Sequence, residues 1–527
     1  MHRLKPVLLA VPAAFLALFF LVPLGRVLLA GADADAWRWL ATPYVQTHLR
    51  IALWQAVLSV LLTFALAVPL AWHHHKRAIP FGRLQLALHG APFVLPVFVV
   101  VGAARALLGP HGWSMQLWGI DGLAVLGPLG VVVLAHAYYN YGFAARLLHA
   151  HLEQRPARLE AAAAVLGASP LERFRRVTLP LMGPAFASVA LLVFLFAFTS
   201  FGVVLLLGQG QMHTLETLLY ENLLGVRVRE ARAAVLGILQ LAINVGLLWA
   251  YFRLQPSAGQ SDAPERRAAR GRDHAISWIA VALALVPAVA VLVGGFRLDG
   301  AWSLEPWRSL LDASHPAHKA GFELWQAVDR SLFYAFWATV VSVGLVLMLA
   351  YGARQGRARR GLEFIGALPL GTSSVLVGLG LLLTYGSGSW LDLRGTLWQI
   401  VIAHTLIAFP FVARAVLPAM DRLDRRLDAA AALLGARPLA VVGRIHWPAL
   451  RGPLLVAVGF AVAMSLGDFG ASLLLMRADN VSLAVWIGRH DEPFRAIAHS
   501  QMLALSGLLM VLASGAYVAI ESFRGRA

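Results

Sequence analysis

The chain has 527 residues, of which 59% are hydrophobic and only 13% are charged, and its mean hydropathy is +0.70. Soluble globular domains of this length do not normally show such values, so the composition predicts a polytopic membrane protein. The formal net charge is +17, and cysteine is absent, which excludes disulfide frameworks, thiolate metal sites and cysteine nucleophiles.

Apolar runs of about 20 residues with few charges are typical of membrane-spanning helices. They predict an all-α fold with about twelve spans, the third of which is weakened by Pro92, Pro96 and Arg105. Breaks of this kind are tolerated where neighbouring helices cover the freed backbone groups. In chain order the runs lie near 6–30, 47–73, 84–108, 122–150, 184–207, 232–254, 275–296, 329–353, 361–385, 395–419, 452–476 and 500–522.

The first run has features of a cleavable signal sequence. Arg3 and Lys5 precede it, and the small residues Ala30-Gly31-Ala32 follow it. The run is about 25 residues long, however, whereas the apolar region of a cleavable signal usually has about 7–15 residues. We therefore expect an uncleaved anchor helix.

The distribution of basic residues predicts the orientation in the bilayer. With the N-terminus inside, 29 of the 44 Lys and Arg residues and 11 of the 27 acidic residues face the inside, which leaves +18 on that side and −1 on the other. The positive-inside rule then places both termini in the cytoplasm. Because the basic excess lies on membrane-flanking loops, we expect no nucleic-acid partner.

The most informative feature is a 21-residue segment that occurs twice. The first copy, Glu160 to Pro180, reads EAAAAVLGASPLERFRRVTLP, and the second copy, Asp428 to Pro448, reads DAAAALLGARPLAVVGRIHWP, with 11 of 21 positions identical and no gap. The offset of 268 residues is about half of the chain, which indicates that a half-chain was duplicated. The segment is polar in an otherwise apolar chain, so we expect it to carry function.

The same offset relates residues outside the two copies. His136 corresponds to His404, and Phe201-Gly202 corresponds to Phe469-Gly470. We expect two halves of six spans each that run parallel, with the pseudo-symmetry axis along the membrane normal. The join is rich in Arg, Ser, Pro and Gly and predicts a solvated linker. The expected units are 1–254 with a core of about 47–252, the linker 255–274, and 275–527 with a core of about 327–522.

Each copy is expected to fold as two short helices around a glycine turn. In the first copy, four successive alanines favour a helix, and Gly167 ends it because glycine adopts a left-handed conformation without steric cost. Pro170 then suits the first position of the second helix, and Ser169 and Glu172 complete a capping box.

The second copy departs from this pattern at its second helix. Asp424 is placed to cap the first helix, Gly435 makes the turn and Pro438 restarts the chain. Arg437 and Ala440 replace the capping pair, so this helix is expected to be less firmly capped.

Alanine-rich helices flanked by arginines suggest a docking surface. Such a surface is flat enough for the groove of a partner protein to approach closely, and the arginines fix the register electrostatically. The alternative is an amphipathic helix that lies on anionic lipid. Because alanines bury too little apolar area for good lipid anchoring, we favour docking of a partner.

The motif Glu-Ala-Ala, followed by glycine and a terminal Leu-Pro, resembles the EAA loop of ABC importer permeases, which inserts into a groove on each cytoplasmic ATPase subunit. The second copy has Asp428 in place of Glu and Trp447 in place of Leu. Two such loops imply a fused permease of two six-helix type I importer halves, the MetI-like fold. The residues that the resemblance assigns to ATPase coupling are Glu160, Ala161, Ala162, Gly167 and Pro170, and Asp428, Ala429, Ala430, Gly435 and Pro438.

The resemblance also implies a location and partners. The location is the bacterial inner membrane, and the partners are two copies of a cytoplasmic ATPase and a periplasmic solute-binding protein. Segments 53–71, 200–222 and 465–475 are similar to those of the thiamine and thiamine pyrophosphate importer permeases, in the same order. This narrower resemblance implies a thiamine-binding protein as the periplasmic partner.

The chain itself has no phosphate-binding loop. That loop requires Gly-Lys-Ser/Thr after a glycine-rich turn, whereas Lys5, Lys76 and Lys319 follow Leu4, His75 and His318. We therefore expect no enzymatic activity and no bound cofactor in this chain, with ATP used by the partner ATPase.

Three alternatives remain open. A ferric iron importer permease is the nearest, because fused permeases of similar layout serve iron import. A proton-coupled secondary transporter has the right size but would be expected to carry several buried carboxylates in its spans. A membrane-embedded enzyme would need clustered His, Asp or Cys ligands, and His73-His74-His75 does not have metal-ligand spacing.

Asp468 is the most notable ionisable residue within a predicted span. An aspartate at a helix centre costs roughly 2.5–3.5 kcal/mol on insertion scales. It either faces a translocation path, near a cationic ligand such as a thiazolium, or lies near a helix end bonded to backbone and hydroxyl groups. Its counterpart in the first half is Ser200, so any role in the path is asymmetric. His136 and His404 recur in both halves, which favours a packing or hydrogen-bonding role.

Overall fold

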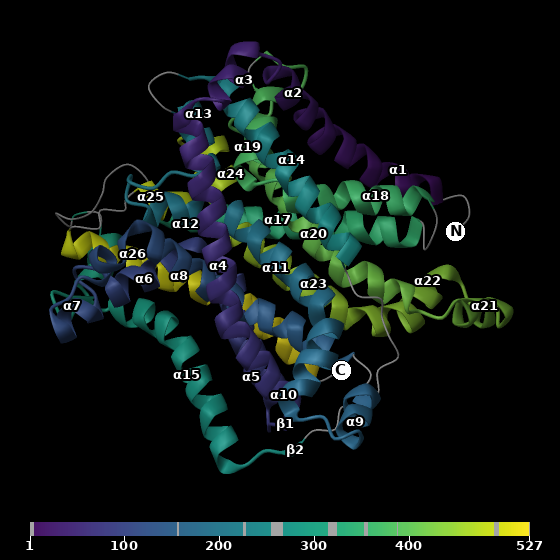
Figure 1. Cartoon of the computed structure of the whole chain (residues 1–527). Coiled ribbons are helices and arrows are strands. Elements are labelled where there is room, and N and C mark those ends of the chain that lie inside the picture. The colour runs from purple at the N-terminus through teal and green to yellow at the C-terminus, as the bar shows by residue number, and fades with distance from the viewer. Residues whose placement is uncertain are drawn as a thin grey trace.

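The structure is a computed structural model, and it describes residues 5–154, 157–224, 228–254, 267–312, 314, 324–352, 357–386, 388–489 and 495–525. Long helices dominate it, and the strands among these residues form two short pairs (Figure 1). The long apolar runs form helices because a chain in lipid must satisfy its backbone hydrogen bonds within each segment.

The first half of the chain contains the following elements. They are α1 Lys5–Leu16, η2 Ala17–Leu21, α2 Val22–Ala30, α3 Ala34–Leu40, α4 Pro43–Lys76, β1 Arg77–Ala78, α5 Gly82–Gly90, η3 Ala91–Val94, α6 Val97–Leu108, α7 Trp113–Trp118, α8 Gly122–Glu153, α9 Ala157–Val165, α10 Pro170–Arg173, η4 Phe174–Thr178, α11 Leu179–Phe198, α12 Gly202–Leu207, α13 Leu215–Leu224 and α14 Glu230–Leu254.

The second half repeats the order of the long helices, with differences in the shorter elements. Its elements are β2 Arg267–Ala268, α15 Gly271–Gly294, β3 Arg297–Leu298, β4 Ala301–Trp302, α16 Glu305–Leu311, α17 Leu324–Gly352, α18 Arg357–Ala367, η5 Leu368–Gly371, α19 Ser374–Thr384, α20 Leu397–Asp421, α21 Arg425–Leu433, α22 Pro438–Val441, η6 Val442–His446, α23 Trp447–Gly467, α24 Gly470–Leu475, α25 Leu483–Arg489 and α26 Ala496–Gly525.

The twelve predicted spans all correspond to helices. Ten helices of the described residues are long and apolar enough to cross a membrane, and the number is twelve if each of two bent pairs is counted as one span. The pair from Gly82 to Trp118 bends by 98°, which fits the prolines noted there, and the pair from Gly361 to Thr384 bends by 106°. The second bend was not predicted, although Pro369 lies within its 3₁₀ turn.

Two predicted spans have the wrong boundaries. The run at 184–207 was expected to be one helix, but α11 ends at Phe198 and α12 begins at Gly202. The run at 452–476 is likewise divided between α23 and α24. Hydropathy does not detect these breaks because the residues on both sides of them are apolar.

The duplication is visible in the positions of the elements. α9 to α13 in the first half and α21 to α25 in the second begin 268 residues apart, pair by pair. In both halves a helix of the copied segment runs into a span, which is followed by a break and two shorter helices. The repeat found in the sequence therefore extends to the backbone.

The two halves interlock. α1 packs against α17 and α2 packs against α19, and the Tyr385 hydroxyl donates to the Leu18 carbonyl at 2.6 Å. Reciprocally, α15 packs against α5 and α6, and the Tyr138 hydroxyl donates to the Ala284 carbonyl at 3.2 Å. The first span of each half thus lies on the other half, outside the predicted cores.

Most of the predicted linker, 255–266, lies outside the described residues. The part that follows is more ordered than expected: Arg267–Ala268 pairs in parallel with Arg77–Ala78, and α15 begins at Gly271 rather than at residue 275. Asp273 in the first turn accepts from the Arg270 amide at 2.9 Å and lies 3.5 Å from Arg77.

Candidate coupling loops and central cavity

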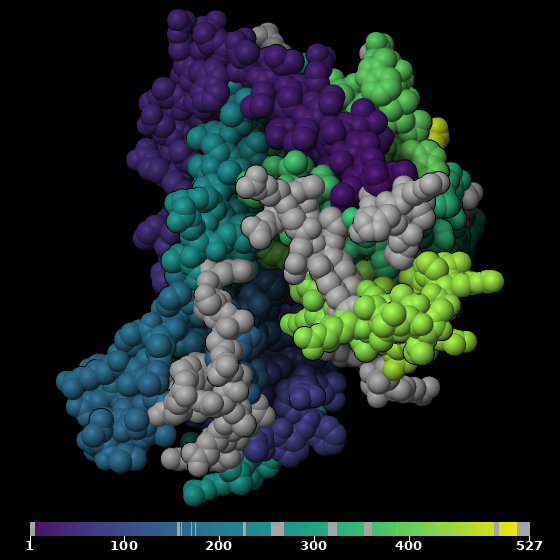
Figure 2. All heavy atoms as spheres, turned by 90° about the vertical axis from the view of Figure 1, so that its right-hand side faces the viewer, coloured from purple at the N-terminus to yellow at the C-terminus, as the bar shows by residue number. Residues whose placement is uncertain are grey.

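The two copies of the repeated segment project from the same side of the molecule. Helices α9 and α21 lie at the lower right of Figure 1, and in Figure 2 the first copy in blue and the second in yellow-green form separate projections. Both chains turn at the predicted glycines, with φ of +82° at Gly167 and +75° at Gly435. The left-handed conformation explains why glycine occupies both positions.

The predicted capping box of the first copy is present. The Ser169 amide donates to Glu172 Oε2 at 2.9 Å, and the Glu172 amide donates to Ser169 Oγ at 3.3 Å. The box satisfies two donors that the start of a helix leaves free.

The second copy is stabilised by different contacts. Asp424 caps α21 as predicted, accepting from the Arg426 amide at 2.9 Å, and Arg437 makes no side-chain cap. His446 is buried, with Nε2 2.8 Å from Asp428 Oδ1 and Nδ1 3.2 Å from the Tyr351 hydroxyl. This chain of contacts links α21 to η6 and α17, and the sequence did not predict it.

The sequence predicted a short, separate second helix in each copy, and this prediction is wrong. From Leu171 the helical path continues through η4 and α11 to Phe198, and from Pro438 it continues through η6 and α23 to Gly467. Each copy is therefore one short helix joined by a turn to the end of a membrane span. A movement of the short helix would be transmitted directly to that span.

The predicted coupling residues lie on these projections. Ala161, Ala162, Gly167, Ala429, Ala430, Gly435 and Pro438 are exposed, and Asp428 is half-buried. Glu160 lies within α9 and Pro170 begins α10, but the side chains of both lie outside the described residues.

Large apolar side chains are exposed at the tips of both copies. Val165 and Leu166 are 88% and 86% exposed, and their counterparts Leu433 and Leu434 are 90% and 88% exposed. Exposed apolar groups next to exposed arginines, such as Arg175 and Arg176 or Arg437 and Arg444, are typical of a surface that a partner covers.

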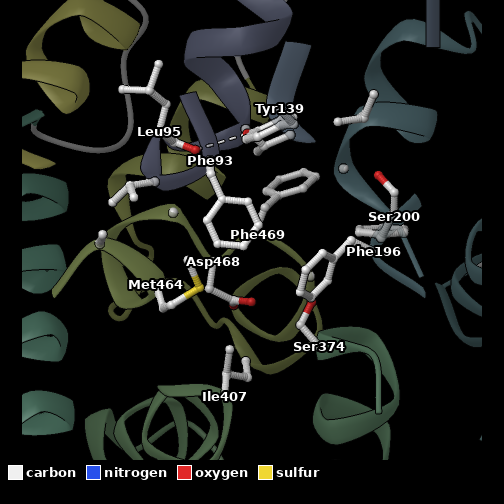
Figure 3. Close-up of a pocket in the computed structure, with 18 of the residues that line it drawn as sticks. Phe93, Leu95, Tyr139, Phe196, Ser200, Ser374, Ile407, Met464, Asp468 and Phe469 are labelled. Carbon is white, nitrogen blue, oxygen red and sulfur yellow. Dashed lines mark hydrogen bonds between the residues drawn. The ribbon is translucent and has the colours of Figure 1, made fainter. Parts of the chain in front are cut away.

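A cavity of about 280 Å³ lies between the two halves. It is lined by the bend before α6, the middle of α8 and α20, the start of α19, and the breaks that follow α11 and α23 (Figure 3). Ser200 and Asp468, the predicted path residues, both line it from equivalent breaks. The equivalent Phe201 and Phe469 stack there with ring centroids 5.8 Å apart and an angle of 23° between the rings.

Asp468 combines features of both sequence-based alternatives. It follows the last residue of α23, and its Oδ2 accepts from the Ser472 amide at 3.0 Å and from Ser472 Oγ at 3.2 Å. His404 Nε2 lies 3.3 Å from the same oxygen. The predicted bonding to backbone and hydroxyl groups is present, and the residue also faces the cavity.

The paired histidines take part in buried hydrogen bonds, as expected. His404 Nδ1 lies 2.7 Å from Ser465 Oγ, and His136 Nδ1 lies 3.3 Å from Ser59 Oγ. His136 lines the cavity directly, whereas His404 stands behind Asp468. Equivalent positions have therefore acquired different surroundings.

Sequence reasoning missed two groups of residues. The aromatic side chains that line the cavity carry no distinctive spacing, and Glu216 lies between the predicted spans 184–207 and 232–254. Glu216 is fully buried in α13, where it accepts a hydrogen bond from Gln240, and its counterpart in the second half is Ala484. Only the equivalence of the halves offered a signal, since an acid that replaces alanine in one copy is unusual.

The histidine run has ordinary partners. His73 Nε2 lies 3.0 Å from Ser277 Oγ, and His75 Nδ1 lies 2.8 Å from Glu153 Oε1. Within the described ranges, no group of three or more His, Asp or Glu side chains is placed to hold a metal ion.

Comparison with known proteins identifies the family. Residues 6–260 and 341–523 match the model of the binding-protein-dependent transport system inner membrane component. The chain belongs to this family. It is therefore a multi-pass transport permease with two MetI-like domains, and the family match agrees with the duplicated fold described above.

Individual relatives align over nearly the full length. The thiamine transport system permease proteins ThiP of Salmonella typhimurium and Escherichia coli are 31% and 30% identical, and each alignment covers 98% of this chain and 94% of the relative. The ferric transport system permease protein FbpB of Actinobacillus pleuropneumoniae is 23% identical, and the alignment covers 80% of this chain and 64% of the relative.

Proposed function

We propose that this chain is the membrane-spanning permease of an ATP-driven importer that carries thiamine and its phosphorylated forms. The observation that carries the proposal is the alignment with two thiamine transport permeases over 98% of the chain, at about 30% identity. In this proposal the chain lies in a bacterial inner membrane with both termini in the cytoplasm. It binds no cofactor, and a separate subunit hydrolyses ATP.

The two copies of the repeated segment would bind two copies of that ATPase. Three structural features support this role of the two copies. They project from one side of the molecule, they have the same backbone conformation, and their tips expose apolar side chains beside arginines. In the first copy the proposed contacts are Glu160, Ala161, Ala162, Gly167 and Pro170. In the second they are Asp428, Ala429, Ala430, Gly435 and Pro438.

Transport would follow from the connection between these helices and the spans. ATP binding draws the ATPases together, and α9 and α21 move the ends of the spans that begin at Leu171 and Pro438. Because these spans end at the cavity, the movement opens it toward the face where a periplasmic thiamine-binding protein docks. The path through the cavity then passes Ser200 and Asp468.

Ferric iron is the second candidate substrate, and the 23% identity with a ferric transport permease supports it. The lining of the cavity favours thiamine. Asp468 is the single carboxylate among the described residues of the lining, whereas a hard trivalent cation is bound by several oxygen ligands. A proton-coupled transporter is disfavoured because the family works with binding proteins.

The test is uptake of radiolabelled thiamine into proteoliposomes that contain the permease, its cognate ATPase and its cognate binding protein. We expect uptake that requires ATP and that an excess of unlabelled thiamine abolishes. Uptake of ferric iron without thiamine uptake would support the second candidate. Thiamine uptake that persists without the ATPase would overturn the proposal of an ATP-driven importer.

A further inference from the structure

We propose that the central cavity is a binding site for a planar organic cation, in which Asp468 supplies the opposite charge and aromatic rings supply the walls. The inference rests on the proposed function and deepens it, because it states which chemical class the permease itself recognises. The proposed site lies within this chain and is separate from the thiamine site of the periplasmic binding protein.

The charge of the cavity is the first argument. Among the described residues that line it, Asp468 is the single acidic residue, and none is lysine or arginine. A carboxylate within a membrane protein is costly and is retained mainly at functional sites. A monocation in the cavity would offset that cost, whereas an anion would add to it.

The two oxygens of Asp468 differ in their contacts. All three polar contacts of the carboxylate with other described residues reach Oδ2, from the Ser472 amide, Ser472 Oγ and His404 Nε2. Within the described part of the chain, Oδ1 has no such contact. Figure 3 shows the carboxylate directed into the space between the surrounding side chains. One oxygen thus holds the group in place and the other is available to a ligand.

The walls are unusually aromatic. Both halves contribute rings, and Phe93 packs against Phe196 with centroids 5.4 Å apart. Faces of aromatic rings attract cations, and this attraction is strongest where water is excluded. A flat heteroaromatic cation can stack on such rings while its charge lies near the carboxylate. The rings that line the cavity belong to Phe93, Tyr139, Phe196, Phe201, Phe411 and Phe469.

A polar group on the opposite half has no partner. His136 is 2% exposed and lines the cavity, and its Nε2 makes no hydrogen bond to any of the described residues. Its equivalent His404 uses both ring nitrogens, toward Ser465 and Ser472. A buried nitrogen without a partner costs free energy, so a ligand that bonds to it is favoured. Thiamine has hydrogen-bonding nitrogen groups on its aminopyrimidine ring that could pair with His136 Nε2.

The size of the cavity limits the ligand. Its volume of about 280 Å³ lies just below the usual range of small-molecule sites, about 300–1,000 Å³. A phosphate chain would add volume and negative charge without a lysine or arginine in the lining to offset it. We therefore expect the cavity to bind thiamine more tightly than thiamine pyrophosphate.

The experiment measures equilibrium binding of radiolabelled thiamine to the purified permease–ATPase complex in lipid nanodiscs without binding protein. We expect saturable binding, and binding at least about tenfold weaker in Asp468→Asn, which keeps the shape but removes the charge. Phe93→Leu, which removes a ring but keeps an apolar side chain, should weaken binding about threefold. Thiochrome, a neutral fused-ring derivative of thiamine, should compete poorly.

Ser472→Ala is the matched control. It removes the Ser472 Oγ contact to Oδ2 but keeps the amide contact and the charge, so it should lower the melting temperature of the complex while thiamine affinity stays near the wild-type value. If Asp468→Asn lowers only the melting temperature and binds thiamine normally, the inference is wrong. The same holds if the neutral thiochrome binds as tightly as thiamine. Absence of thiamine uptake by the wild-type importer would instead contradict the proposed function.

Discussion

The two copies of the repeated segment have the same backbone but are held by different polar contacts. In the first copy, Ser169 and Glu172 form a local capping box. In the second copy that box is absent, and Asp428 is linked through His446 to Tyr351 on another helix. The capping box depends on neighbours in sequence, whereas the contacts of His446 depend on tertiary packing. A duplicated element can therefore keep its geometry while the interactions that stabilise it are exchanged.

The largest effect is expected where the copies are identical, at the turn glycines. Gly167→Pro or Gly435→Pro should abolish thiamine uptake and stimulation of the ATPase, because proline fixes φ near −65° and both turns need a positive φ. Membrane insertion should be unchanged. Gly183→Ala is the control, since an added Cβ there meets no atom within 4 Å. Normal uptake in either proline variant would refute the coupling role of that copy.

The next comparison concerns the acidic residues at equivalent positions. Because the first copy matches the EAA pattern more fully, we expect Glu160→Ala to reduce ATPase stimulation more than Asp428→Ala. Measurement of ATP hydrolysis with saturating binding protein and thiamine would test this order. A larger loss in Asp428→Ala would show that the contact with His446 matters more than similarity to the motif.

The contact with His446 has its own test. His446→Ala should destabilise the second copy locally by about 1–3 kcal/mol, because it leaves Asp428 and the Tyr351 hydroxyl without this partner. Limited proteolysis should then cleave near Leu433 faster than in the wild type, with the rate near Val165 unchanged. Equal acceleration at both sites would indicate a general loss of stability.

A smaller difference is expected at the caps. Ser169→Ala should cost about 1 kcal/mol of local stability. Arg437→Ala, the equivalent change in the second copy, should cost almost nothing, because Arg437 makes no side-chain cap. Hydrogen exchange of the amides that begin α10 and α22 measures both effects. Similar changes in the two variants would show that the capping box contributes little.

The sequence by itself determined the class of the protein, the number of spans, the duplication and the two glycine turns. These features follow from local rules: apolar length sets a span, and a positive φ selects glycine. The capping box of Ser169 and Glu172 was predictable for the same reason, since both partners lie within one helical turn.

The tertiary structure alone decided which residues meet. It placed the first span of each half on the other half, divided two apolar runs at Ser200 and Asp468, and brought His446 to Asp428. It also gathered phenylalanines from both halves around one carboxylate. Apolar patterning encodes which side chains avoid water, but not which distant partners they contact, because many arrangements of spans satisfy the same hydropathy.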